Sequence, residues 1–326
     1  MKLSIIVPVY NASNCIEALY SSLSQIKIDE KELIFVDDCS QDNSRALIEA
    51  LAERDPSVHL HVHENNCGAG IARNTGFATA SGDYCLFFDA DDLINTQAVK
   101  EIVDLLDTTS ADLAIATYEL TKEADGSNGR IGKRDRGIFD RILQGEDHKL
   151  TKLAACADLL TFTNYPWNKI IRTSYARKIN LWYSATKVQN DVHAHWQSLL
   201  FSSSLLVCDK VLAKHIVPAN GSNITNISCE KRLESFKALQ DVEDLFSREP
   251  DLRARYYRDF VCFKIMLFNF INTKLNRNYF QQFIEKVNES IYLSNFQEFV
   301  ALREKYPEIA NDIYSILANP YGFYKV

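Results

Sequence analysis

The sequence predicts an α/β protein in which helices flank a mostly parallel sheet, followed by a C-terminal α-helical region. Over residues 3–88, short apolar runs alternate with stretches in which apolar residues recur at helical spacing. Strands that alternate with helices in this way form a parallel sheet that is covered on both faces. After residue 229 the apolar residues recur at helical spacing alone, which indicates the helical region.

The first strand is a β-branched run over residues 3–9, and Pro8 is expected to end it because proline has no N–H to donate. Two later apolar runs end directly in aspartates, at Asp37 and Asp89. The elements expected after the first strand are a helix over 15–23, a strand over 32–36, a helix over 46–51, an alternating strand over 58–62, a helix over 70–80 and a buried strand over 84–88.

Three carboxylates, those of Asp89, Asp91 and Asp92, follow the last of these strands. Neighbouring like charges disfavour one another's ionisation, and a hard divalent cation, which prefers oxygen ligands, would relieve the repulsion. The alternative is an Asp-rich turn or a helix N-cap. Asp37 and Asp38 also end a strand. Since ligands bind at the carboxyl ends of parallel strands, one crevice is expected to collect both groups.

Five segments stand in order along the chain: IIVPVYN (5–11), VDDCSQDNS (36–44), NNCGAGIARNTG (65–76), ASGDY (80–84) and FDADD (88–92). Taken together, they resemble the family-2 glycosyltransferases of the GT-A fold, and the resemblance covers about the first two hundred residues. It implies a Rossmann-like GT-A sheet and an inverting transfer of a sugar from a nucleotide sugar, usually a UDP-sugar, to an acceptor hydroxyl. Enzymes of this kind act in bacterial surface polysaccharide or glycolipid synthesis.

The resemblance assigns the nucleotide to four residues. Asp38 would accept the imide N–H of uracil, a donor that lies between two carbonyl groups. Arg73 would lie beside the base and the diphosphate, where a guanidinium can reach carbonyl and phosphate oxygens. Pro8 and Tyr10 would form the floor under the base. The alternative for Arg73 is an ordinary surface arginine of a helix.

The same resemblance assigns the sugar and a metal to the segment Asp89-Ala90-Asp91. Asp89 would face the ribose or sugar hydroxyls and, together with Asp91, would ligate the metal. His215 stands near the end of the expected catalytic domain, where some GT-A enzymes supply a further ligand. The expected cofactor is a divalent cation, Mn²⁺ or Mg²⁺, because its ligands are mainly carboxylate and phosphate oxygens.

A catalytic base is needed because an acceptor hydroxyl is a weak nucleophile until its proton is removed. In the family an acidic pair supplies the base, after a Trp-Asn-Lys segment and at the start of a helix. This chain has Trp167-Asn168-Lys169 and then Asn190-Asp191, so Asp191 holds the base position and Asn190 replaces the usual glutamate. The alternative for Asp191 is a helix N-cap, and both roles are compatible. The helix N-terminus is expected to keep Asp191 ionised.

The expected domains are a catalytic domain, 1–225, and a helical domain, 226–326, for acceptor, membrane-surface or oligomer contacts. Two polar stretches, 122–137 and 218–226, are expected to be loops beside the site, and Gly221-Ser222 fits a segment that closes over the donor in the family. Residues 260–275 combine aromatic and basic side chains, as a helix on a membrane surface does. The alternative is a core helix of its own domain.

Composition supports a cytoplasmic enzyme. Such an enzyme is also expected to be able to contact the inner face of the cell membrane. No apolar run reaches the length of a membrane span, and the N-terminus enters a strand without a signal segment. The eight cysteines show no paired spacing, and the net charge of −7 argues against a nucleic-acid partner. The expected partners are a UDP-sugar and a saccharide or lipid-linked saccharide acceptor, and the oligomeric state is left open. The alternatives are another nucleotide sugar as donor, or a non-catalytic nucleotide- or glycan-binding member of the fold.

Overall fold

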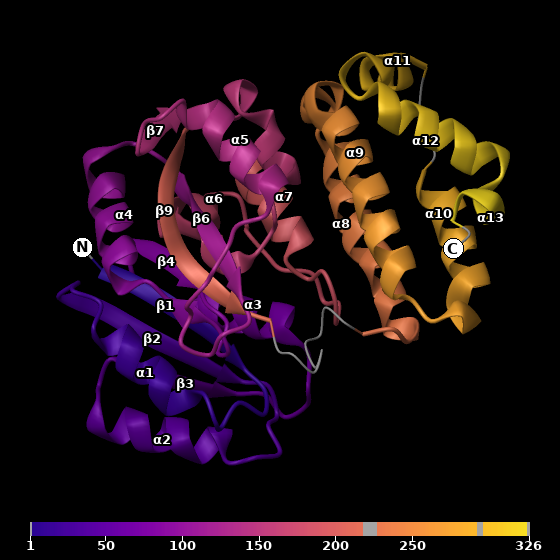
Figure 1. The fold of residues 1–326 in the computed structure, drawn as a ribbon. Coiled ribbons are helices and arrows are strands. Elements are labelled where there is room, and N and C mark those ends of the chain that lie inside the picture. The colour runs from indigo at the N-terminus through magenta and orange to yellow at the C-terminus, as the bar shows by residue number, and fades with distance from the viewer. Residues whose placement is uncertain (1, 218–226, 292–295, 325–326) are drawn as a thin grey trace.

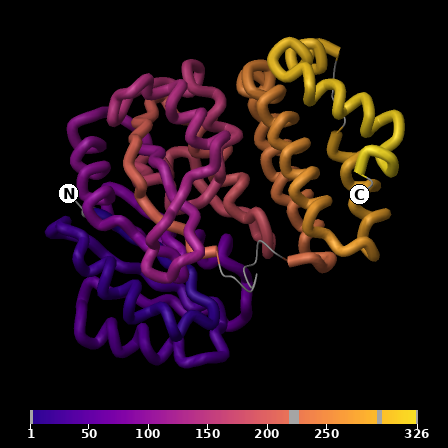
Figure 2. Tube along the Cα trace, viewed as in Figure 1, coloured from indigo at the N-terminus to yellow at the C-terminus, as the bar shows by residue number. Residues whose placement is uncertain are grey.

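The structure is a computed structural model that describes residues 2–217, 227–291 and 296–324. It has two adjoining parts, an α/β part and a layer of helices beside it (Figure 1). The C-terminal segments, drawn in orange to yellow in Figure 2, lie together in the helical part. The predicted order of an α/β region and a helical region is therefore confirmed.

The α/β part is built on one mixed sheet. Its strands, in the described residues, are β1 (Lys2–Val9), β2 (Glu30–Asp37), β3 (Val58–Val62), β4 (Tyr84–Phe87), β5 (Leu93–Ile94), β6 (Leu113–Thr121), β7 (His148–Thr151), β8 (Lys169–Arg172) and β9 (Leu205–Ile216). Their spatial order is β3-β2-β1-β4-β8-β6-β9-β5, and β7 pairs with β9 beside this path. The pairs among β3, β2, β1 and β4 are parallel, as predicted, whereas β8 joins β4 and β6 in antiparallel fashion.

Pro8 does not end strand β1, contrary to the prediction. It lies opposite Val36 of β2, and the strand continues to Val9. The nitrogen of Pro8 faces the β4 side, where strand pairing stops at Ile6 and the Phe88 N–H already bonds to the Ile6 carbonyl. On the other side, the Val9 carbonyl accepts the backbone N–H of Asp38, the residue that follows β2. The missing N–H therefore removes no bond from the sheet.

The helices of the α/β part in the described residues are α1 (Ile16–Ser24), α2 (Ser44–Arg54), α3 (Ala69–Thr79), α4 (Thr96–Thr108), α5 (Lys133–Leu143), α6 (Thr173–Lys178) and α7 (Val192–Leu200), with the 3₁₀ turns η1 (Leu153–Ala155), η2 (Ala157–Thr161) and η3 (Pro166–Asn168). The predicted α1, α2 and α3 are confirmed. A Cβ on Gly76 of α3 would lie 2.5 Å from a methyl of Ile6 in β1. The glycine thus allows α3 to pack closely on the sheet.

The stretch 122–137 is a loop only in its first part. Helix α5 begins at Lys133, within the predicted loop, because Ile138, Phe139 and Leu143 form an apolar stripe that is buried. Residues 122–137 are polar and contain several glycines, and the apolar stripe begins only at their C-terminal end, so the sequence pattern did not indicate the helix. The second predicted loop, with Gly221-Ser222, lies outside the described residues.

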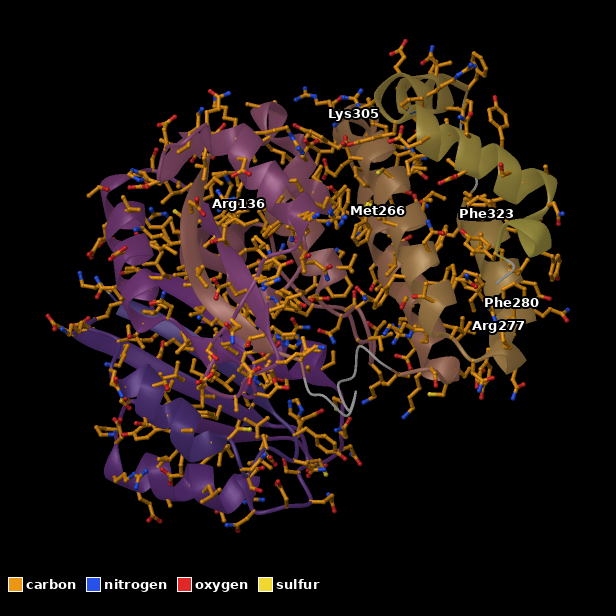
Figure 3. All side chains as sticks on the ribbon, viewed as in Figure 1. Arg136, Met266, Arg277, Phe280, Lys305 and Phe323 are labelled. Carbon is orange, nitrogen blue, oxygen red and sulfur yellow. The ribbon has the colours of Figure 1, made fainter. Side chains whose placement is uncertain are left out.

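The helical part in the described residues contains η5 (Glu230–Glu234), α8 (Ser235–Arg248), α9 (Pro250–Lys274), η6 (Arg277–Tyr279), α10 (Phe280–Ser290), α11 (Phe296–Lys305), α12 (Pro307–Ala318) and α13 (Pro320–Phe323). It packs on the α/β part through Trp196 of α7. The indole lies edge-on to the rings of Phe260 and Phe263 of α9, with centroid distances of 5.0 and 5.6 Å. Met266 of α9, labelled in Figure 3, accepts a hydrogen bond from Arg134 at 3.2 Å.

Helix α9 is a core helix. Phe260, Phe263 and Phe268 are all buried, and Lys264 is buried in an ion pair with Glu243. Of the two interpretations of residues 260–275, the structure therefore supports the core helix and not the membrane-surface helix, because Phe260, Phe263 and Phe268 pack against neighbouring helices. Within the described part of the chain, no helix combines the length and the apolar character that crossing a bilayer requires.

Candidate functional site

The predicted site residues meet at the carboxyl ends of β1, β2 and β4. The Asp38 N–H bonds to the Val9 carbonyl at 2.8 Å, and the Phe88 N–H bonds to the Ile6 carbonyl at 2.9 Å. These bonds bring the segments that follow the three strands to one edge of the sheet. Tyr10 follows directly and is 51% exposed, so its ring is available to a ligand.

Asp38 organises the loop that precedes α3. Its buried carboxylate accepts the backbone N–H groups of Cys67 at 2.8 Å and Gly68 at 2.6 Å. The His63 ring is bonded through Nδ1 to Asp38 Oδ1 at 2.8 Å and through Nε2 to Thr75 Oγ1 at 2.9 Å. Gly68 has a φ of +92°, which a side chain would strain. The role of Asp38 in binding uracil stays a prediction. In the structure its carboxylate also holds the loop before α3 through Cys67 and Gly68.

The cluster of Asp38, His63 and Cys67 offers three ligand atoms that all lie within 4.8 Å of one another. Such a set of carboxylate, imidazole and thiol could hold zinc. Both ring nitrogens of His63 and both oxygens of Asp38 already have protein partners. Hydrogen bonding within the donor-site loop therefore explains the cluster.

Arg73 of α3 joins the acidic motif to the segment before Asp191. Its guanidinium is buried, forms an ion pair with Asp89 and donates to Asn190 Oδ1 at 2.6 Å. Burial lowers the pKa of Arg73 most strongly, but Asp89, Tyr183 and Asp191 together outweigh burial and raise it. Arg73 is therefore a charged residue inside the site, and the alternative of an ordinary surface arginine is wrong.

The acidic motif has two environments. Asp91 is exposed, while the protein around it and the nearby charge of Asp89 raise its pKa. Asp92 is buried, and its Oδ1 is bonded to His215 Nδ1 at 2.7 Å. Its Oδ2 is buried without a partner among the described residues. Ala90, between the two motif carboxylates, is buried.

The donor chemistry of the acidic motif suits a divalent cation. A histidine that ligates a metal characteristically has its other ring nitrogen bonded to a carboxylate, as His215 is to Asp92. Burial would lower the pKa of His215, but Asp92, with Asp91 and Asp89, together outweigh burial and raise it. Asp89, Asp91 and His215 carry the oxygen and imidazole donor types that Mn²⁺ accepts. In the described residues, however, the group of three ligand atoms within 4.8 Å of one another is that of Asp38, His63 and Cys67, so the ligand set at the acidic motif stays a prediction.

Asp191 stands at the N-cap position of α7, but its side chain makes no capping hydrogen bond. The residue is partly buried. Burial raises the pKa of Asp191 to about 6, against the opposing effects of Arg73 and Lys169. Loss of solvent is thus the largest influence on its pKa, while at about 6 the carboxyl is still mostly ionised at pH 7, as expected. A carboxylate with a pKa near neutrality is suited to accept a proton.

Two further residues of the site carried no assigned role in the sequence. Lys169, which begins β8, is buried and donates from Nζ to the Tyr165 carbonyl at 3.0 Å and to Asn168 Oδ1 at 2.6 Å. Burial lowers the pKa of Lys169 to about 7, although Asp191 opposes the shift. The Tyr183 ring lies 5.3 Å from the Arg73 guanidinium. Only the Trp-Asn-Lys segment signalled Lys169, and nothing in the sequence signalled Tyr183.

A family model described as "Glycosyl transferase family 2" matches residues 4–179. The chain belongs to this family. The match spans Asp38, Arg73 and Asp91, so the strand-end motifs of this family-2 glycosyl transferase lie within it. It ends before Asp191, which leaves the base position outside the matched range.

Curated relatives of this glycosyl transferase match parts of the chain. Glycosyltransferase GlyA of Streptococcus pneumoniae is 32% identical over 125 residues, which are 38% of this chain and 18% of GlyA. The uncharacterized glycosyltransferase YibD of Escherichia coli is 28% identical over 191 residues, 59% of this chain and 54% of YibD. The poly(ribitol-phosphate) beta-N-acetylglucosaminyltransferase TarS of Staphylococcus aureus is 32% identical over 132 residues, 40% of this chain and 22% of TarS. The chain thus spans less than two thirds of the length of each of these relatives.

Solved structures resemble the transferase over nearly its whole length. The crystal structure of S. aureus TarS has a TM-score of 0.70 at 20% identity and covers 97% of this chain and 55% of that one. A structure of TarS 1–349 in complex with UDP-GlcNAc has a TM-score of 0.69 at 18% identity, with 98% and 92% covered. The similarity includes the C-terminal helices, so the predicted GT-A fold followed by a helical region is confirmed.

Proposed function

We propose that this family-2 enzyme is an inverting, metal-dependent hexosyltransferase that moves a sugar from a UDP-sugar to an acceptor hydroxyl in the synthesis of a bacterial surface polysaccharide or glycolipid. One arrangement carries the proposal: Arg73 binds both Asp89 and Asn190, the residue before Asp191. It brings the donor motif and a carboxylate of raised pKa to one crevice. The fold shared with a TarS structure that contains UDP-GlcNAc supports a UDP-sugar as donor.

The nucleotide would bind at the strand ends. Asp38 has accepted three hydrogen bonds, and a carboxylate has about four acceptor positions, so one remains for the uracil imide N–H. The exposed Tyr10 ring and Pro8 would lie under the base. Arg73 would lie beside the diphosphate, whose charge matches the guanidinium.

A divalent cation, Mn²⁺ or Mg²⁺, would be held by Asp91 and Asp89, with His215 as a further ligand. When bound, such a cation neutralises charge that develops on the departing diphosphate. The chain's own contribution is to orient these ligands. Asp92 fixes the His215 ring through their 2.7 Å bond. Arg73 holds Asp89 in place from the other side.

Asp191 would act as the general base. It takes the proton of the acceptor hydroxyl while the oxygen forms a bond to the anomeric carbon. The bond from that carbon to the diphosphate oxygen breaks in the same displacement, and its electron pair leaves with UDP. Attack on the face opposite the leaving group inverts the anomeric configuration. The raised pKa of Asp191 keeps the carboxylate basic enough for this task while it stays mostly ionised at pH 7.

We further propose a catalytic domain over 1–225 and a helical domain over 226–326. The acceptor would be a saccharide or a lipid-linked saccharide, and the location cytoplasmic, because UDP-sugars are cytoplasmic metabolites. Most aromatic side chains of α9 are buried, and Phe270 is the exposed one, so contact with the inner face of a membrane would have to use mainly other surfaces.

A panel of nucleotide sugars tests the donor. The wild-type protein is incubated with UDP-GlcNAc, other UDP-sugars, GDP-sugars and dTDP-sugars, with Mn²⁺ or with EDTA, and nucleoside diphosphate release is measured. UDP release that requires Mn²⁺ and is lost in Asp191→Asn supports the proposal. Release of another diphosphate alone would contradict the UDP specificity. Nucleotide binding without release of any diphosphate would instead identify a non-catalytic member of the family.

A further inference from the structure

The segment that carries Asp191 is held by the donor-site helix on one side. This segment, residues 182–191, lies between α6 and α7 and is called the base loop below. The Tyr183 N–H donates to Asn74 Oδ1 at 2.8 Å, and Asn74 Nδ2 donates to the Tyr183 carbonyl at 2.9 Å. At the other end of the loop, Asn190 accepts from Arg73. Both partners belong to α3, so the base loop is bound to the helix that carries the donor residues.

The helical part holds the base loop from the other side. Ser184 Oγ donates to Asp241 Oδ2 of α8 at 2.5 Å. The Lys187 N–H donates to Glu234 Oε2 of η5 at 2.6 Å. Hydrogen bonds to carboxylates are shorter and stronger than neutral ones. The two carboxylates therefore fix the middle of the base loop, whereas α3 fixes its ends.

Displacement of Ser184 would be transmitted to the base. The Ser184 N–H donates to the Asn190 carbonyl at 2.9 Å, which closes the loop on itself next to Asp191. The Ser184 carbonyl also lies where a Cβ on Gly70 would be, at 2.2 Å, so the loop is pressed against α3. A shift at Ser184 therefore moves the residue before Asp191.

We propose that the C-terminal helical region positions the catalytic base: Asp241 and Glu234 hold Ser184 and Lys187, and so keep Asp191 at the donor crevice. The inference rests on the proposed role of Asp191 as base. Asp241 is then a positioning residue that acts through Ser184 and touches neither donor nor acceptor. The proposal gives the helical region an indirect part in the chemistry, through the position of Asp191, besides any contact with the acceptor.

The polar contacts are not needed to dock the two parts. Trp196 of α7 packs against Phe246, Phe260 and Phe263 at centroid distances of 6.1, 5.0 and 5.6 Å. These rings are buried and provide apolar contact between the parts. Removal of the Asp241 carboxylate should therefore leave the helical region in place and loosen only the base loop.

The test uses variants of the full chain. Asp241→Ala and Ser184→Ala each remove the bond, Asp241→Asn keeps an acceptor for Ser184, and Asp244→Ala is the matched control, an exposed carboxylate on the same helix. UDP release is measured with the UDP-sugar of highest turnover in the panel above, UDP-GlcNAc in the first instance. Hydrogen exchange of peptides covering residues 182–191 gives a second readout that does not depend on activity.

The proposal predicts that Asp241→Ala lowers kcat about 10- to 100-fold, because a displacement of about 1 Å can cost that much. The KM for the donor and the melting temperature stay near those of the wild type, and amide exchange rises in the base loop alone. Asp241→Asn restores kcat to within about threefold. The double variant Ser184→Ala/Asp241→Ala is no slower than either single one, since both remove the same contact.

Two results would overturn the inference, and they differ from a failure of the proposed function. If Asp241→Ala matches Asp244→Ala in rate and exchange while Asp191→Asn is inactive, the base assignment stands and the positioning role is wrong. If Asp241→Ala lowers the melting temperature and weakens donor binding together, the contact serves only to hold the fold. If Asp191→Asn keeps full activity, the base itself is misassigned, and the proposed function fails first.

Discussion

Replacing Asp191 by asparagine is expected to stabilise the fold while it removes most of the activity. Burial raises the pKa of this carboxyl from 3.8 to about 6. Because the folded pKa lies above the unfolded one, the folded state binds more protons between these values, and its stability falls as the pH rises through this range. At neutral pH the wild type therefore bears the full cost of a desolvated charge, which asparagine lacks.

The size of the effect follows from the shift. A difference of about two units corresponds to roughly 3 kcal/mol at about 1.4 kcal/mol per unit. Water reaches the partly exposed side chain of Asp191, so a gain of about 1–2 kcal/mol is the expected net value. For a protein of 326 residues the gain should raise the melting temperature by about 1–3 °C. Since Asp191 makes no side-chain capping bond, asparagine loses no such contact.

Thermal unfolding of the wild type and Asp191→Asn at pH 7.5 and pH 4.5 tests this prediction. The difference in melting temperature should be present at pH 7.5 and shrink at pH 4.5, where the wild-type carboxyl is mostly protonated in the folded state. Asp244→Asn, which changes an exposed carboxylate of α8, should behave like the wild type at both values. A variant that is less stable than the wild type at pH 7.5, or a gain that does not depend on pH, would refute the reasoning.

Three further variants probe the rest of the site. Asp91→Asn should weaken Mn²⁺-dependent UDP binding by at least the ~10-fold that loss of an outer-shell partner costs; calorimetry with Mn²⁺ and with EDTA measures it, and equal affinities would remove the metal from this motif. Arg73→Lys loses one of the two acceptors that the guanidinium holds, so the Kd for UDP should rise about tenfold, and an unchanged Kd would place the diphosphate elsewhere. Asn190→Asp adds a negative charge beside Asp191 and should move the rising limb of the pH–rate profile upward by about one unit; a profile that stays in place would show that residue 190 does not sense the base.

The strand framework could be predicted from the sequence because buried parallel strands are continuous apolar runs. Residues 3–7 of β1 and 33–36 of β2 are all buried, and each run ends near a turn. The acidic motif and Asp191 could be found because their residue types and order match a known family. Helix α5 was not predicted from the sequence because its apolar stripe begins only after a charged, glycine-containing segment.

Other features depend on contacts between distant residues, which local patterns do not contain. The hydrogen bond between His63 and Asp38 joins residues 25 positions apart, and the one between Ser184 and Asp241 joins residues 57 positions apart. The aromatic spacing of α9 predicts a helix, but the surfaces that cover it include those of α7 and α8, so the sequence alone did not exclude a membrane-facing helix. The raised pKa of Asp191 likewise follows mainly from burial in three dimensions, which the sequence does not show.

The pH dependence of UDP release by the wild type and by Asp191→Asn tests the central claim most directly. If Asp191 is the base at a donor crevice, the wild-type rate rises with pH through an apparent pKa of about 6. The variant should show no such rise and should be slower by about 10²- to 10⁴-fold, the usual contribution of a general base. A variant that keeps the same rising limb, at a rate within about threefold of the wild type, would contradict the account.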